Sequence, residues 1–160
     1  MSERRLATPP RDPDRNGDAS SAPRAPARFA FGLRVYYEDT DAAGIVYYAN
    51  YLRFMERART EWMESLGFPL AAFEAAHGVT FAVLRAEIDF LRPARLYDRL
   101  AVTVEPRALR GARLDVAQEI RRDGERLVHG VIVLACVGLA KLRPARIPRV
   151  LADRLHAVIA

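Results

Sequence analysis

Cysteine is nearly absent from this chain of 160 residues, since Cys136 is the only one. A single cysteine excludes an internal disulfide framework and any zinc site built from several thiolates. Long apolar runs are missing too. The longest covers residues 131–140 and is interrupted by Gly138, whereas a bilayer crossing needs about 20 residues. We therefore expect no transmembrane segment.

Lysine is also scarce, because 24 of the 25 basic residues are arginine, and the net charge is +5. Guanidinium groups bind phosphate in a bidentate manner, so the excess suits anionic ligands. Nucleic acid is not an expected partner, because no nucleic-acid-binding motif is present. The histidines, of which there are 3, lie on separate predicted elements without ligand spacing. We expect neither a metal nor another cofactor.

Residues 1–28 differ in composition from the rest of the chain, with five prolines, six arginines and no apolar run. Such a segment buries too little surface to offset its ordering entropy, so it predicts a disordered tail. It also lacks the apolar stretch of a secretory signal, which favours a cytoplasmic location. The remaining residues, 29–160, predict one folded domain.

Helical spacing of apolar residues predicts one long helix over residues 48–66, stopped by Gly67 and Pro69. Period-two alternation or β-branched runs predict strands at residues 29–37, 79–90, 100–104, 114–120 and 127–139, the last of them central. Shorter helices are expected at 70–77 and 151–159. Only an antiparallel sheet is large enough to bury the apolar face of the long helix, which includes Leu52. The prediction is an α+β chain whose sheet wraps around one central helix, the order of a hotdog fold.

The stretch most informative about chemistry is residues 34–51, which places Asp41 on a loop containing Gly44, just before the long helix. A helix N-terminus offers free backbone N–H groups and a partial positive charge, which polarise a carbonyl oxygen placed there. The neighbouring carboxylate is suited to attack that carbonyl or to activate water. An acidic loop before a helix is more often only a cap, so the motif alone leaves both interpretations open.

The segment Asp41-Ala42-Ala43-Gly44-Ile45-Val46-Tyr47 resembles the signature of the 4-hydroxybenzoyl-CoA thioesterase family, and most closely that of the Tol–Pal-associated YbgC type. Similarity continues through about residue 150, in patches that agree in order and spacing. These patches are residues 54–61, 93–98, 109–111 and 141–144.

The resemblance implies a hotdog hydrolase of acyl-CoA thioesters, with Asp41 as the catalytic carboxylate and the N–H of Tyr48 as the donor to the thioester carbonyl. Gly44 matches the loop glycine that permits close approach of backbone and substrate. The YbgC type usually has histidine where this chain has Tyr48, but the backbone N–H survives that change. The expected substrate is a short-chain or aromatic acyl group on CoA or on acyl carrier protein.

Further candidates surround this motif. Arg110 matches a position where the family tends to place a basic residue near the CoA phosphates. An equal alternative is that Arg110 is simply a solvated residue of a basic hairpin. Tyr51 and its aromatic neighbours recur at helical spacing, which predicts that they pack in the core. The alternative is that they line a slot for the acyl or aryl group. Glu38 and Asp39 are expected to face solvent. Glu56 is expected in a helix salt bridge, with a pocket-lining role as the alternative.

Hotdog subunits usually pair so that their sheets join, and by this analogy we expect a homodimer or a homotetramer. Two other functions stay open. A dehydratase would need a base for a carbon-bound proton, usually histidine, and this loop offers none. A non-catalytic acyl-thioester-binding or scaffold protein would keep the pocket without the turnover.

Overall fold

The computed structural model describes residues 29–159, and the predicted disordered tail, residues 1–28, lies outside that range. The strands are β1 (Phe29–Arg34), β2 (Val79–Phe90), β3 (Arg99–Arg110), β4 (Arg113–Arg122) and β5 (Glu125–Gly138). The helices are α1 (Asn50–Ser65), α2 (Leu70–His77) and α3 (Arg149–Ile159), with a short 3₁₀ helix, η1 (Tyr37–Asp39), after β1. The expected strand, helix, helix and four-strand order is therefore present.

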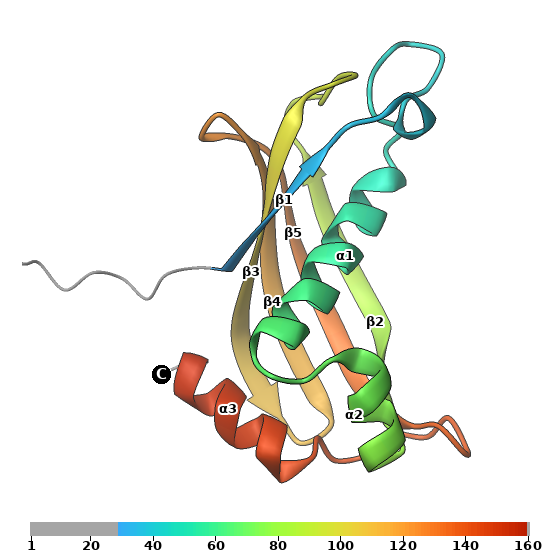
Figure 1. The fold of residues 1–160 in the computed structure, drawn as a ribbon, viewed down its shortest axis with the longest axis vertical. Coiled ribbons are helices and arrows are strands. Elements are labelled where there is room, and N and C mark those ends of the chain that lie inside the picture. Colours follow the sequence, from blue (N-terminus) through green and yellow to red (C-terminus); the bar gives the residue numbers. More distant parts are fainter. Residues whose placement is uncertain (1–28, 160) are drawn as a thin grey trace, which may run out of the picture.

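The strands form one antiparallel sheet in the order β1-β3-β4-β5-β2. The predicted central strand, β5, lies between β4 and β2, and the Asp123-Gly124 turn joins it to β4 as a hairpin. β1 and β2 are the two edges of the sheet. Figure 1 shows α1 lying along the face around which the sheet curves, with α3 against the lower part of β3.

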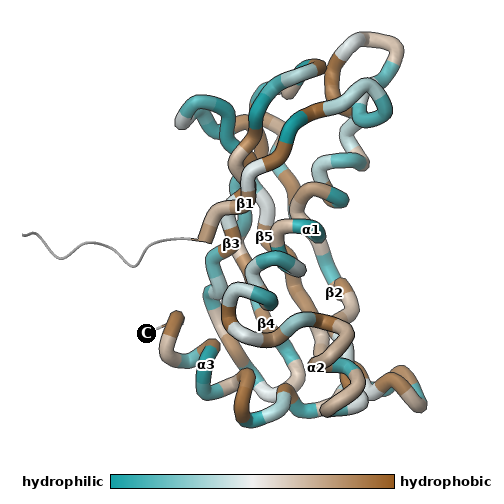
Figure 2. The backbone as a smooth tube through the Cα atoms, in the orientation of Figure 1, coloured by the Kyte–Doolittle hydropathy of each residue, from teal (hydrophilic) through white to brown (hydrophobic). Residues whose placement is uncertain are grey.

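Periodicity explains how α1 joins the sheet. Its buried side chains recur at helical spacing, and the inward residues of the strands alternate with polar ones (Figure 2). The prediction of Leu52 on the buried face is wrong, since 42% of its surface is exposed. The core side of the helix is instead rotated toward Tyr51, Phe54 and Trp62, which are at most 4% exposed.

Gly130 on β5 lets the helix and the sheet approach closely at the centre of the core. A Cβ atom at this position would lie 2.6 Å from Cδ1 of Ile88 and 3.1 Å from Cε of Met55. The space that a larger residue would occupy is thus filled by a strand side chain and a helix side chain. Within residues 29–159, no helix has both the length and the apolar character needed to cross a bilayer.

Candidate active site

The loop between η1 and α1 is a small hairpin closed by a bridge between Thr40 and Val46. Inside it, the N–H of Gly44 donates to the carbonyl of Asp41 at 3.0 Å, and the N–H of Asp41 donates to the carbonyl of Ile45 at 2.9 Å. Gly44 has φ +73°, a left-handed conformation in which a Cβ would be strained. The glycine singled out in the sequence therefore sets the path of the loop that carries Asp41.

Ala94 ties this loop to the long helix through its backbone. The N–H of Val46 donates to the Ala94 carbonyl at 2.9 Å, and the N–H of Ala94 donates to the hydroxyl of Tyr51 at 2.9 Å. Ala94 is fully buried, so both bonds are shielded from water. In Figure 1 the segment before β3 lies beside the loop at the upper end of the sheet, which agrees with a bridge between Ile45 and Arg95.

The start of α1 leaves backbone donors available. The helix begins at Asn50, two residues later than predicted, because a turn precedes it in which the N–H of Asn50 donates to the Tyr47 carbonyl at 2.8 Å. Ala49 occupies the N-cap and provides no side-chain cap, and the first turn of α1 holds no acidic residue. Within the described part of the chain, the N–H of Tyr48 has no hydrogen-bond acceptor. This donor lies at the positive end of a 16-residue helix.

Asp41 has an exposed side chain on the loop. One carboxylate oxygen accepts the N–H of Ala43 at 2.8 Å, which fixes the rotamer and leaves the other oxygen without a partner among residues 29–159. The negative charge of Asp41 makes a small contribution to the raised pKa of the Tyr51 hydroxyl, after burial and Asp98. The carboxylate and the buried tyrosine are thus electrostatic neighbours.

Several influences act on the pKa of Tyr51. Burial raises this pKa most, and the negative charges of Asp98 and Asp41 raise it further. The Ala94 N–H and the cation of Arg122 act in the opposite direction. The hydroxyl of Tyr51 therefore stays protonated and serves as a fixed acceptor for Ala94.

Asp39 corrects one prediction, because it does not face solvent. Its side chain is 8% exposed and accepts the N–H of Tyr36 at 2.8 Å, while its carbonyl accepts bonds from the side chain of Asn50 and the N–H of Tyr47. Asp39 is therefore a structural residue that connects η1 to the start of α1. Its neighbour Glu38 is exposed, as expected.

A cavity of about 250 Å³ adjoins the Tyr48 turn. Aromatic side chains form much of its wall, since Phe90 lies 6.2 Å from the ring of Tyr48 and 5.7 Å from the ring of Tyr51. Asp41 is not a lining residue, but Ile45 of the same loop is. Phe90 was not among the sequence candidates. The sequence feature that could have indicated Phe90 is its place as the last apolar residue of a predicted strand, shortly before the break at Pro93.

Arg110 does not join this group. It is an exposed residue at the far end of β3, whereas the cavity lies near the end where Arg99 pairs with Arg34 of β1. Eleven residues of strand separate the two ends by roughly 35 Å. Asp41 and Gly44 thus lie on the loop that leads into Tyr48 and Tyr51, whereas Arg110 ends β3 at the opposite end of the sheet.

Glu56 forms no ion pair among the residues that the structure describes. Its carboxylate instead accepts a hydrogen bond from Thr60 at 2.9 Å and lines a second pocket, between α1 and β2. The salt-bridge interpretation is wrong for the described residues, and Glu56 lines this second pocket rather than the cavity beside Tyr48.

Known proteins share both the sequence and the fold. Residues 35–155 match the thioesterase-like superfamily. The acyl-CoA thioesterase YbgC of Haemophilus influenzae is 38% identical over 128 residues, which cover 80% of this chain and 94% of that protein. The 1,4-dihydroxy-2-naphthoyl-CoA hydrolase of Thermosynechococcus vestitus is 38% identical over 90 residues, 56% of this chain and 62% of that protein.

A solved structure of a probable thioesterase from Bartonella henselae superposes with a TM-score of 0.71 at 35% identity, covering 76% of this chain and all of the other. The hotdog prediction is confirmed by this likeness and by the five-stranded sheet around α1. The prediction of a thioester hydrolase is confirmed at the level of the family. With its signature loop, its uncapped central helix and these relatives, the chain belongs to the thioesterase-like superfamily, in the group of the YbgC acyl-CoA thioesterases.

Proposed function

We propose that the chain hydrolyses acyl-CoA thioesters at the start of α1, with Asp41 as the reacting carboxylate and the N–H of Tyr48 as the donor to the carbonyl oxygen. The observation that carries this proposal is the unpartnered Tyr48 N–H beside an aromatic cavity, within the described part of the chain. A carbonyl oxygen bound there gains a donor that needs no reorganisation as negative charge develops.

The reaction follows from these two groups. Asp41 either attacks the thioester carbonyl carbon itself or takes a proton from a water molecule that attacks it. Both routes place negative charge on the carbonyl oxygen, where the Tyr48 N–H and the helix N-terminus stabilise it. The C–S bond then breaks and the CoA thiolate leaves, which requires no strong general acid. In the water route the acyl group leaves as the free acid, whereas in the direct route it forms a mixed anhydride with Asp41 that water then hydrolyses. A sparse site of this kind is therefore sufficient for a thioester.

A short-chain or aromatic acyl group fits the cavity beside Tyr48. Its walls are mostly apolar and include Tyr48, Tyr51 and Phe90, with Arg92 as the one charged lining residue among those described, and aromatic rings pack favourably against such walls. The relative from Thermosynechococcus vestitus is named for an aromatic acyl-CoA. The carrier is CoA or acyl carrier protein.

Two copies of the chain pair along β2 in this proposal. β2 is an edge strand of 12 residues, and its exposed side chains include Val83 at 52% and Leu84 at 64%. A long apolar edge without a partner is a site for strand pairing. In such a pair, Arg110 contacts the phosphates of a CoA molecule bound at the Tyr48 cavity of another copy, because Arg110 lies far from the Tyr48 cavity of its own copy. Sedimentation equilibrium tests the pairing: Leu84→Lys should yield monomers, and a parent that is monomeric would exclude it.

The activity is tested by thiol release from a panel of acetyl-, butanoyl-, benzoyl- and dodecanoyl-CoA, with matched acyl carrier protein thioesters. Asp41→Asn should lower kcat about 10²-fold or more, in the range of positioned acid–base groups. Glu38→Gln is the matched control, because it removes an exposed carboxylate three residues away. It should keep the parent's turnover, and all three proteins should melt alike.

Equal turnover of the parent and Asp41→Asn would remove Asp41 from the chemistry. A parent that binds acyl-CoA but releases no thiol with any acyl group would instead favour the non-catalytic alternative. Formation of a carbon–carbon double bond without thiol release would indicate the dehydratase.

A further inference from the structure

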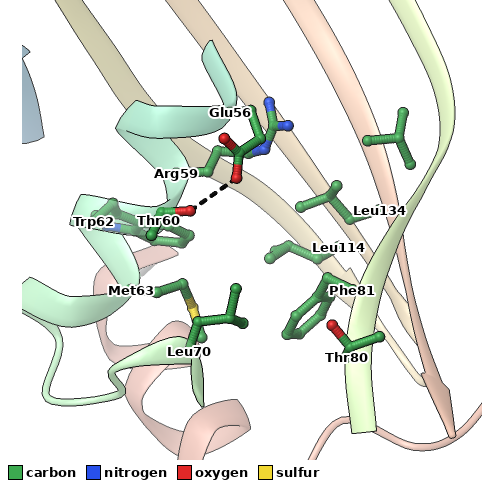
Figure 3. A pocket seen from close by; sticks show the side chains of 11 residues that line it. Glu56, Arg59, Thr60, Trp62, Met63, Leu70, Thr80, Phe81, Leu114 and Leu134 are labelled. Carbon is green, nitrogen blue, oxygen red and sulfur yellow. Dashed lines mark hydrogen bonds between the residues drawn. The ribbon is translucent and has the colours of Figure 1, made fainter. Parts of the chain in front are cut away.

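A second pocket, of about 140 Å³, lies between α1 and β2, more than a helical turn beyond the Tyr48 turn. Most of its wall is apolar, with Met63 and Leu70 on the helical side and Phe81, Leu114 and Leu134 on the sheet side (Figure 3). Its charged groups lie at one end, on α1, where Glu56 and Arg59 are close to Thr60, and the hydroxyl of Thr80 on β2 is its other polar group (Figure 3). A mostly apolar pocket with a few grouped polar atoms is the usual form of a small-molecule site.

Arg59 is held in this pocket by a residue that does not neutralise it. Its guanidinium donates to the side-chain oxygen of Gln118 at 2.7 Å. Gln118 is fully buried, and its own amide donates to the carbonyls of Met55 at 3.1 Å and Thr103 at 3.3 Å. These two bonds fix the glutamine with its oxygen toward Arg59. The cation is therefore oriented by a neutral acceptor.

The charge of Arg59 has no contacting counter-ion. Within residues 29–159, no carboxylate forms an ion pair with it, and Gln118 is the only acceptor for its N–H donors. A guanidinium has five such donors. Glu56 acts on it only from a distance and is itself bonded to Thr60. Burial lowers the pKa of Arg59, which shows that its charge is partly desolvated.

We infer that this pocket binds the far end of the acyl group and selects one that carries an oxygen acceptor, a carboxylate or a hydroxyl, through Arg59. This inference rests on the proposed thioesterase function and adds a specificity-determining residue to it. An apolar end alone would leave a desolvated cation with unused donors, whereas an oxygen would satisfy them. Glu56 at the same end adds an acceptor for a hydroxyl. The volume suits the end of an acyl group rather than a nucleotide.

The length of acyl group that reaches Arg59 depends on the copy that supplies the pocket. Along α1 of one copy, Arg59 lies about 16 Å from Tyr48, at a rise of 1.5 Å per residue. Across a β2–β2 interface, the pocket of the partner is available to a shorter group. The test therefore uses two lengths: hexanoyl-, 6-hydroxyhexanoyl- and adipyl-CoA, and dodecanoyl-, 12-hydroxydodecanoyl- and dodecanedioyl-CoA.

In the parent, kcat/KM for the carboxylate or hydroxyl member of at least one set should exceed that for its methyl-ended member by about tenfold, the equivalent of one charge-assisted hydrogen bond. Arg59→Met should lower this kcat/KM ratio to one or below, and Arg59→Lys should keep a ratio between that value and the parent's. Arg57→Met is the matched control, because Arg57 is an exposed arginine on the same helix. It should leave the ratio unchanged. A change in the ratio, rather than in kcat alone, separates selection from a loss of folding.

A parent that prefers methyl-ended substrates in both sets would overturn the inference, and this result needs no variant to fold. An Arg59→Met protein that melts like the parent and keeps the parent's ratio would overturn it as well. If no thioester is hydrolysed, the proposed function fails. Calorimetric binding of the same six compounds to the parent then decides the inference, because the carboxylate or hydroxyl member of at least one set should bind about tenfold more tightly than its methyl-ended member.

Discussion

The two halves of α1 meet their surroundings in different ways. At the N-terminal end the groups available to a ligand belong to the backbone: the N–H of Tyr48 is unpartnered in the described chain, and Ala94 joins the loop to the helix. Farther along, the groups belong to side chains, since Gln118 orients Arg59 within a mostly apolar pocket. One helix thus borders two proposed sites, one made of backbone groups just before its start and one made of side chains farther along.

This contrast explains which substitutions each half tolerates. A site made of backbone donors depends on the path of the chain and little on the side chain at that position. The tyrosine side chain at position 48 is compatible with such a site. A site made by Arg59 and Gln118 depends on both side chains, because each fixes the other.

Among the stability changes, the largest effect is expected from Gln118→Leu, which disrupts the Arg59–Gln118 pair. This substitution removes the acceptor of Arg59 and leaves a half-buried guanidinium without its partner. We expect a loss of about 2–3 kcal/mol in the free energy of unfolding, typical of hydrogen bonds to charged groups. Urea denaturation measures it. Arg113→Gln, on the exposed end of the same strand, should change stability by less than about 1 kcal/mol, because it removes only an exposed ion pair with Asp115. Equal effects of the two variants would contradict this account of Gln118.

A smaller loss of unfolding free energy is expected from Tyr51→Phe, near the N-terminal end of α1. The change deletes only the hydroxyl that accepts the N–H of Ala94, and it leaves that buried donor unsatisfied. The expected loss is about 1–2 kcal/mol in unfolding free energy. Tyr37→Phe is the control, since Tyr37 is 82% exposed. An unchanged urea midpoint for Tyr51→Phe would mean that the bond does not anchor the loop.

Much of the fold was predictable because its signals are local. Alternation and helical spacing indicated each described strand and α-helix, and Gly67 and Gly78, with φ +92° and +64°, end the helices where the sequence suggested. The strand predicted at 29–37 ends at Arg34, before η1, and the strand predicted at 100–104 continues to Arg110. The start of α1 was predicted two residues early. The turn that delays it depends on hydrogen bonds to Asp39 and Tyr47 rather than on hydrophobic spacing.

The candidate site was predictable only where its residues are close in sequence. Asp41, Gly44 and Tyr48 lie on one short segment, and the resemblance marked all of them. Phe90 and Gln118 come from strands far along the chain, and no local pattern links them to α1. Asp39 was misjudged because a carboxylate in a polar loop usually faces water, whereas here it caps η1 by accepting the N–H of Tyr36.

The most direct test of the central claim is to delete the N–H of Tyr48 while keeping the turn. Tyr48 is the second residue of the turn from Tyr47 to Asn50, a position where proline is favoured. Tyr48→Pro therefore removes the donor with little strain, and Tyr48→Ala removes only the side chain.

Steady-state thiol release should show that Tyr48→Ala keeps most of the parent's kcat, while Tyr48→Pro loses about 10²–10³-fold, as expected for one oxyanion donor. Both variants should melt near the parent. If Tyr48→Pro is folded and turns over as fast as Tyr48→Ala, the backbone N–H does not act on the thioester, and the account is contradicted.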